Sequence, residues 1–188
     1  MKKIKPIVTD NRVIFGSCRL SYTHLFAKYD PNGSPEGGKY MTNVLIPKSD
    51  KATVDALNSA IEHAKNTAIA GKWGGKLPKK LDLALRDGDE KDDPVYKDHW
   101  YINAKSSTRP GVVDKDRALI MDAEEVYSGM WAVVSVTFYG YDVSGNRGIA
   151  AGLNHVMKTA DGERLGGQTS AESEFAKVVF DDEDDDDL

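Results

Sequence analysis

The stretch VYSGMWAVVSVTFYGY, residues 126–141, decides the fold of this chain. It is rich in Val, Thr, Trp, Phe and Tyr, the residue types that favour extended strands. Its alternation predicts one apolar row that points inward and one mixed row that points outward. These rows are Val134, Val136 and Phe138 on the inside, and Ser135, Thr137, Tyr139 and Tyr141 on the outside. Turn-forming residues follow at 142–146, so residues 147–157 should return as the second strand of a hairpin.

The flanking sequence adds further strands and one helix. Residues 12–26, 40–46 and 99–105 have the composition of strands. The alternation in 99–105 predicts Trp100, Ile102 and Ala104 on one face, and His99, Tyr101, Asn103 and Lys105 on the other. In residues 50–70, apolar side chains recur at three- and four-residue spacing, which predicts an amphipathic helix that ends at Gly71. A mainly β chain with one helix and turn signals between the strands indicates a small antiparallel barrel or an α+β fold with extended loops.

The C-terminus carries an unbroken acidic run. Its residues are Asp181, Asp182, Glu183, Asp184, Asp185, Asp186 and Asp187, followed by Leu188. Such a run repels itself, so we expect one folded domain over residues 1–178 and a disordered acidic tail over residues 179–188. The whole chain has 25 basic and 30 acidic residues, and without the seven tail carboxylates 25 basic residues face 23 acidic ones. A slightly basic body with a polyanionic tail suggests a protein that binds a polyanion and carries a mimic of it, although a tail that only aids solubility is the alternative.

Several classes of site and segment find no support in the sequence. Cys18 is the only cysteine, so an internal disulfide and a cysteine-based metal site within one chain are excluded. We expect no signal peptide, no membrane span, no cofactor and no metal. Residues 87–93 form a second acidic cluster, which is typical of a solvated turn but leaves a metal-dependent nuclease as an alternative.

Cations and aromatic side chains are interleaved along the strands. Binding of single-stranded nucleic acid without sequence preference needs cations for the phosphates and aromatic faces for the bases. The candidate binding residues are Tyr101, Asn103, Lys105, Arg109, Tyr139, Tyr141 and Arg147, with Lys72, Trp73 and Lys76 in a glycine-rich loop. Packing in the core is the alternative for each aromatic residue, but the glycines around Trp73 favour binding there.

Five longer motifs occur in a fixed order and carry a family resemblance. They are LRDGDEK at 85–91, INAKSSTRPGVVD at 102–114, EVYSG at 125–129, NRGIAAGLN at 146–154 and LGGQTSA at 165–171. Together they resemble a family of bacteriophage single-stranded-DNA-binding proteins, over nearly the whole chain from about Ser17 to Leu188.

The resemblance implies an OB-fold core with an inserted helix and extra loops, and no enzymatic activity. It implies a role in phage DNA replication, recombination or repair in the cytoplasm of the infected bacterial host. The resemblance also implies that the tail contacts phage or host replication proteins. From its charge, we expect separately that the tail shields the DNA groove, so its removal should also expose weak duplex binding. A homodimer is left open, and an interaction protein whose tail mimics DNA is a further alternative.

Overall fold

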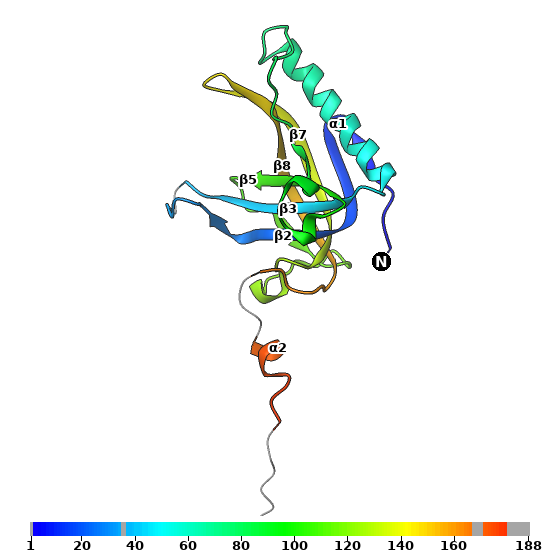
Figure 1. Cartoon of the computed structure of the whole chain (residues 1–188), viewed down its shortest axis with the longest axis vertical. Coiled ribbons are helices and arrows are strands. Elements are labelled where there is room, and N and C mark those ends of the chain that lie inside the picture. The colour runs from blue at the N-terminus through cyan, green and yellow to red at the C-terminus, as the bar shows by residue number, and fades with distance from the viewer. Residues whose placement is uncertain (1, 35–36, 167–170, 180–188) are drawn as a thin grey trace, which may run out of the picture.

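The structure confirms the hairpin predicted from residues 126–157. β7 (Trp131–Val143) pairs antiparallel with β8 (Asn146–Ala160) along almost their whole lengths. The two residues of the turn, Ser144 and Gly145, have φ angles of 52° and 83°. Two positive φ angles are the signature of the tight turns whose twist matches that of the flanking strands. The hairpin therefore projects as a continuous arm (Figure 1).

The computed structural model describes residues 2–34, 37–166 and 171–179. The other strands are β1 (Ile7–Thr9), β2 (Arg12–Tyr29), β3 (Lys39–Pro47), β4 (Leu85–Asp87), β5 (His99–Ser106) and β6 (Gly111–Val113). The helices are α1 (Lys51–Ala70) and a short α2 (Ala171–Phe175), and the 3-10 turns are η1 (Gly88–Glu90), η2 (Pro94–Tyr96) and η3 (Ala123–Glu125). The sequence predicted α1 but not α2. Among the described residues no helix has the length and apolar character needed to cross a bilayer.

Five of these strands close into a barrel in the order β2, β3, β5, β8 and β7. Neighbouring strands are antiparallel except at the closing seam, where β5 runs parallel to β8 with Ala104 opposite Ala151 and Lys105 opposite Gly152. This is the OB-fold-like antiparallel barrel that was expected, closed by one parallel pair. The β2–β3 and β7–β8 pairs extend beyond the barrel as two arms, and α1 lies on the other side (Figure 1).

The long strand β2 takes part in both halves of the barrel because it bends. Its register with β7 shifts between Phe15 and Cys18, around Gly16. Gly16 has a φ of 145°, and a Cβ built there would lie 2.6 Å from the carbonyl oxygen of Ala132. A glycine at this bulge therefore permits both the backbone conformation and the close approach of β7.

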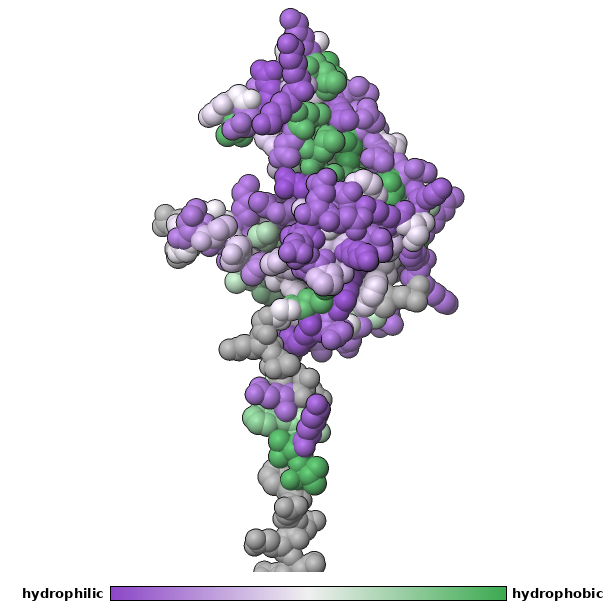
Figure 2. Space-filling model, in the orientation of Figure 1, coloured by the Kyte–Doolittle hydropathy of each residue, from purple (hydrophilic) through white to green (hydrophobic). Residues whose placement is uncertain are grey.

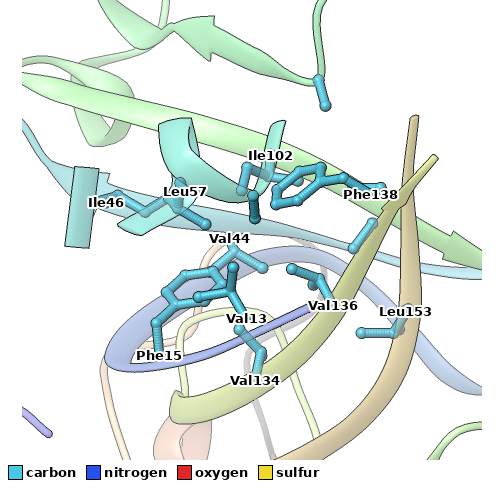
Figure 3. Close-up of a cluster of buried hydrophobic side chains, with 14 of the residues drawn as sticks. Val13, Phe15, Val44, Ile46, Leu57, Ile102, Val134, Val136, Phe138 and Leu153 are labelled. Atoms are coloured by element: carbon cyan, nitrogen blue, oxygen red, sulfur yellow. The ribbon is translucent and has the colours of Figure 1, made fainter. Parts of the chain in front are cut away.

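The barrel interior is filled by the inward rows of the strands. Val134, Val136 and Phe138 are fully buried, which confirms the orientation predicted for β7. Figure 3 shows these side chains pointing toward Val13 and Phe15 of β2, and toward the inward residues of β3, β5, β8 and α1. The outward rows leave a surface that is mostly hydrophilic on the face shown in Figure 2.

Helix α1 begins and ends as the sequence predicted. The side chain of Asp50 accepts hydrogen bonds from the backbone nitrogen of Thr53 at 3.4 Å and from its hydroxyl at 2.9 Å, and Gly71 follows the last helical residue. The helix packs closely on β7 at Gly140, where an added Cβ would lie 2.4 Å from the Cβ of Ala68. Gly140 thus permits helix and strand to approach each other.

Trp73 corrects the expectation of an exposed binding residue. Its side chain is 3% exposed, and its indole Nε1 donates a hydrogen bond to the carbonyl oxygen of Tyr141 at 3.1 Å. The glycines that follow it, Gly74 and Gly75, have φ angles of 63° and 86°. They let the chain reverse after α1 and bring the ring against the bare backbone of Gly140.

Phe138→Ala should lower the free energy of unfolding by about 3–5 kcal/mol, because it leaves a large cavity in the barrel core. Urea denaturation followed by circular dichroism measures this loss. Val143→Ala is the control, since Val143 lies on the same strand but is 62% exposed, and it should change stability by less than about 0.5 kcal/mol. Equal losses in the two variants would contradict the assigned faces of β7.

Candidate nucleic-acid interface

A groove of about 240 Å³ lies on the outer surface where β5 meets the β7–β8 arm. Four of the predicted binding residues line it: Asn103, Lys105, Tyr139 and Tyr141. The other lining residues are Lys39, Asp82, Leu83, Ala84, Arg86, Ile149, Ala150 and Ala151. The fold therefore brings together residues that are far apart in the sequence: Lys39 and Ala151 are 112 positions apart.

The closing seam of the barrel sets the geometry of this groove. Lys105 is opposite Gly152 in the parallel pair of β5 and β8, and both face outward. The ring of Tyr139 leans over Gly152, since a Cβ built there would lie 3.4 Å from Cε1 of the ring. Tyr139 is 42% exposed, so one aromatic face is open to solvent beside a lysine. This pairing of an open ring with a cation is the basic unit of single-strand binding.

Tyr141 forms a more fixed wall of the same groove. Its hydroxyl donates a hydrogen bond to Oδ2 of Asp82 at 3.1 Å, and its ring lies against Gly148. Burial raises the pKa of Tyr141, and the Asp82 carboxylate raises it further. Asp82 also pairs with Arg86 at 3.3 Å. The ring is therefore held in place by this chain of polar contacts.

Tyr101 lies on the outer face of β5, as predicted, but beside the groove and not in its lining. Its ring meets the fully buried Tyr96 edge-on, with centroids 5.1 Å apart. The Nζ of Lys91 lies 4.8, 4.4 and 5.1 Å from the ring centroids of Tyr22, Tyr96 and Tyr101. Tyr96 in turn accepts a hydrogen bond from Asn43 at 2.7 Å. The segment between β4 and β5 thus folds over Tyr101 and already contacts its ring.

The remaining predicted cations do not line the groove. Lys72 donates to the carbonyl oxygen of Gly140 at 3.1 Å, and Arg147 donates to Oδ2 of Asp142 at 2.8 Å. Lys76 is exposed in the loop after α1. Arg109 lies 4.6 Å from the ring centroid of Phe26 on the β2–β3 arm. The ion pair to Asp142 leaves Arg147 less available to a phosphate than an isolated arginine would be.

The aromatic and basic side chains of the β2–β3 arm were not among the predicted binding residues. The rings of His24 and Tyr29 stack with centroids 4.5 Å apart, and Lys28 lies 5.9 Å from the ring centroid of Tyr40. Burial lowers the pKa of His24, which favours its neutral form. The mixture of aromatic and basic residues in positions 22–29 was the available signal. The register shifts of β2 in this region hide the simple alternation that would have assigned their faces.

The acidic residues of the nuclease alternative have structural partners. Asp87 and Asp89 both pair with Lys48 at 2.6 Å, and hydrogen bonds from this ammonium lower the pKa of both carboxyl groups. Asp93 accepts a hydrogen bond from the backbone nitrogen of Val95 at the start of η2. Within the described ranges, no group of three His, Cys, Asp or Glu side chains could hold a metal ion. The cluster therefore has the geometry of a capped turn, which favours a solvated turn over a metal-dependent nuclease.

The residues predicted to contact partner proteins, from Asp181 to Leu188, lie outside the described residues.

Comparison with known proteins places this geometry in a family. The family model described as the ssDNA-binding protein of Enterobacter phage Enc34 matches residues 11–188. A protein called p50 from Acyrthosiphon pisum secondary endosymbiont phage 1 is 32% identical over 176 residues, which cover 87% of this chain and 92% of that protein.

Solved structures agree with this match. The single-stranded DNA-binding protein of bacteriophage Enc34 in complex with ssDNA has a TM-score of 0.74 and 28% identity, covering 88% of this chain and 97% of that chain. A C-terminal truncation of the same protein gives a TM-score of 0.72 with 28% identity, covering 88% and 96%. The gp2.5 protein of bacteriophage T7, at 17% identity, has a TM-score of 0.54 over 89% of this chain and 92% of its own, and shows a shared fold.

The Enc34 family model and the Enc34 structures are named for DNA binding and not for a catalytic activity, in agreement with the prediction of a non-enzymatic protein. The resemblance carried by the five sequence motifs is likewise confirmed. The chain belongs to the family of the single-stranded-DNA-binding protein of Enterobacter phage Enc34.

Proposed function

We propose that this protein binds single-stranded DNA without sequence preference, with the groove of β5, β7 and β8 as the centre of its binding surface. One observation carries the proposal: Tyr139 presents an open ring beside Lys105 across the bare backbone of Gly152. Family membership supports it, since a relative that shares the fold over most of the chain was solved with single-stranded DNA.

The ring and the cations have separate roles in this mechanism. A base stacks on Tyr139, a contact worth about 1–3 kcal/mol that every base can make because each has a flat aromatic face. Lys39 and Lys105 line the groove and take neighbouring phosphates. Their binding releases the counterions of the strand, so affinity falls as salt rises. The aromatic and basic side chains of the β2–β3 arm extend the same chemistry along the strand.

The protein then acts in the replication, recombination or repair of phage DNA, in the cytoplasm of the infected bacterium. This assignment rests on the phage origin of the relatives. Residues 181–187 act as a competing polyanion over the groove when DNA is absent, and they contact phage or host replication proteins when DNA displaces them. If bound DNA raises the affinity of the tail for a partner protein by some factor, that partner should raise the affinity for DNA by the same factor, because the coupling between two sites is reciprocal.

Tyr139→Ala should weaken binding of an oligothymidine by about 1–3 kcal/mol, because it removes the stacking face. Fluorescence titration at fixed salt measures this change. Tyr139→Phe is the matched control: it keeps the ring and loses only the hydroxyl, so it should bind within about twofold of the parent, a difference of less than about 0.5 kcal/mol. An equal loss in both variants would show that stacking on this ring is not the source of the affinity.

Lys105→Gln should reduce the magnitude of the salt dependence, the slope of log K against log salt, by up to about one unit. The reason is that one phosphate contact no longer releases a counterion. Lys51→Gln is the control, since Lys51 is exposed at the start of α1 and away from the groove. The same slope in the Lys105 variant and the parent would remove Lys105 from the contact surface.

Deletion of residues 181–188 should raise the affinity for single-stranded DNA, most strongly at low salt, because it removes a polyanion that competes for the groove. Gel shifts with poly-dT and with duplex DNA measure this effect, and weak duplex binding should emerge only in the truncated protein. Unchanged affinity at low salt would reject shielding by the tail. Loss of all DNA binding in both proteins would instead favour an interaction protein whose tail mimics DNA.

A further inference from the structure

A second concave surface, distinct from the DNA groove, lies on the outer face of β2, β6, β7 and β8. It has a volume of about 330 Å³, and its floor is apolar: Ile14, Val113, Val133 and Met157 contribute to it. These residues lie side by side because Val133 pairs with Met157, Val113 pairs with Met157 from the other side, and Ile14 pairs with Ser135. We call this surface the apolar groove.

Two arginines flank the apolar groove. Arg12 of β2 and Arg117 of the loop after β6 both line it, and both are exposed. Arg12 donates a 3.3 Å hydrogen bond to the hydroxyl of Ser135, which holds its side chain over β7. In the described part of the chain, neither guanidinium takes part in a salt bridge. An apolar floor between two arginines is complementary to an apolar side chain flanked by carboxylates.

The chain carries such a segment at its own end. Leu188 directly follows seven consecutive acidic residues, so an apolar side chain stands next to a row of carboxylates. We propose that Leu188 inserts into the apolar groove of its own chain, with the neighbouring carboxylates on Arg12 and Arg117. Reach does not limit this contact. Of the 22 residues after Gly166, five form α2, and the other 17 span up to about 56 Å when extended. This is more than three times the radius of gyration of about 16 Å expected for a folded chain of this length.

Because of where the apolar groove lies, docking of Leu188 there would affect DNA binding. Val133 and Tyr139 point outward from the same strand, and their separation of six residues corresponds to about 20 Å. Seven extended acidic residues span about 23 Å. With Leu188 anchored at Val133, the acidic run can follow the outer face of β7 past Arg12 to Tyr139 and Lys105. This second step rests on the proposed function, whereas the docking of Leu188 does not.

Spin labelling tests the docking without DNA. Asp187→Cys places a nitroxide next to Leu188. The native Cys18 does not compete for the label, because it is 2% exposed and burial raises its pKa to about 12. We expect the label to broaden the amide signals of Val113, Arg117 and Met157 in a nitrogen-15 correlation spectrum, with recovery when the nitroxide is reduced.

Two further variants separate anchoring from general attraction of the acidic run. Adding Leu188→Ser to the labelled protein should abolish the broadening at the apolar groove, although all seven acidic positions but the labelled one remain. Arg117→Glu should weaken it while leaving the rest of the spectrum in place, which reports on folding. Broadening that is absent, that is confined to residues around Lys105 and Tyr139, or that persists unchanged with Leu188→Ser would overturn the proposal.

The link to DNA has its own measurement. Leu188→Ser without a label should raise affinity for an oligothymidine at low salt, by less than deletion of residues 181–188 does. If the labelled protein shows docking but Leu188→Ser does not change the affinity for oligothymidine, Leu188 docks in the apolar groove without helping the tail to shield the DNA groove. Because the spectrum is recorded without DNA, failure of the proposed DNA binding would leave the docking result unaffected.

Discussion

Closure of the barrel depends on the short parallel pairing of β5 and β8. Only two residue pairs form it, Ala104 with Ala151 and Lys105 with Gly152. On the inner side the pairing buries two alanines, whose small side chains let the strands meet over a filled core. On the outer side it places Lys105 next to the glycine that Tyr139 covers. A shift of this seam by one residue would turn Lys105 inward and separate the cation from the ring.

The sequence contained the elements whose formation is local. The alternation of residues 126–141 correctly assigned the inward and outward rows of β7, and that of residues 99–105 did the same for β5. Apolar spacing and the glycine at position 71 correctly bounded α1. Such features depend on neighbours a few positions away, so a single sequence carries them. The order of the strands and the closing seam depend on distant pairings, and only the structure gives them; the family resemblance supplied the expectation of an OB-fold barrel.

The side chains whose exposure or pairing was predicted wrongly, or not predicted at all, are those that make long-range contacts. The exposure of Trp73 could not be judged from its flanking glycines, because its partner surface at Gly140 lies 67 positions away. The ion pair between Arg147 and Asp142 forms across the hairpin turn, where composition alone gave only an arginine next to a turn. Lys91 lies in an acidic segment, yet its ammonium contacts three tyrosine rings that come from different parts of the chain. In each case a long-range contact, not residue type, decides how available the side chain is.

The two tyrosines that cover glycines on β8 also have a consequence for the shape of a bound strand. Tyr139 and Tyr141 are two residues apart on β7, so their Cα atoms are about 6.8 Å apart. Their rings lean toward Gly152 and Gly148, which are four positions apart on β8. Successive bases in a duplex rise by only about 3.4 Å. A strand whose neighbouring bases used both rings would be drawn out to twice its helical rise, with its bases pulled apart. The spacing of side chains along one face of the β-strand would then hold neighbouring bases too far apart to form a double helix again.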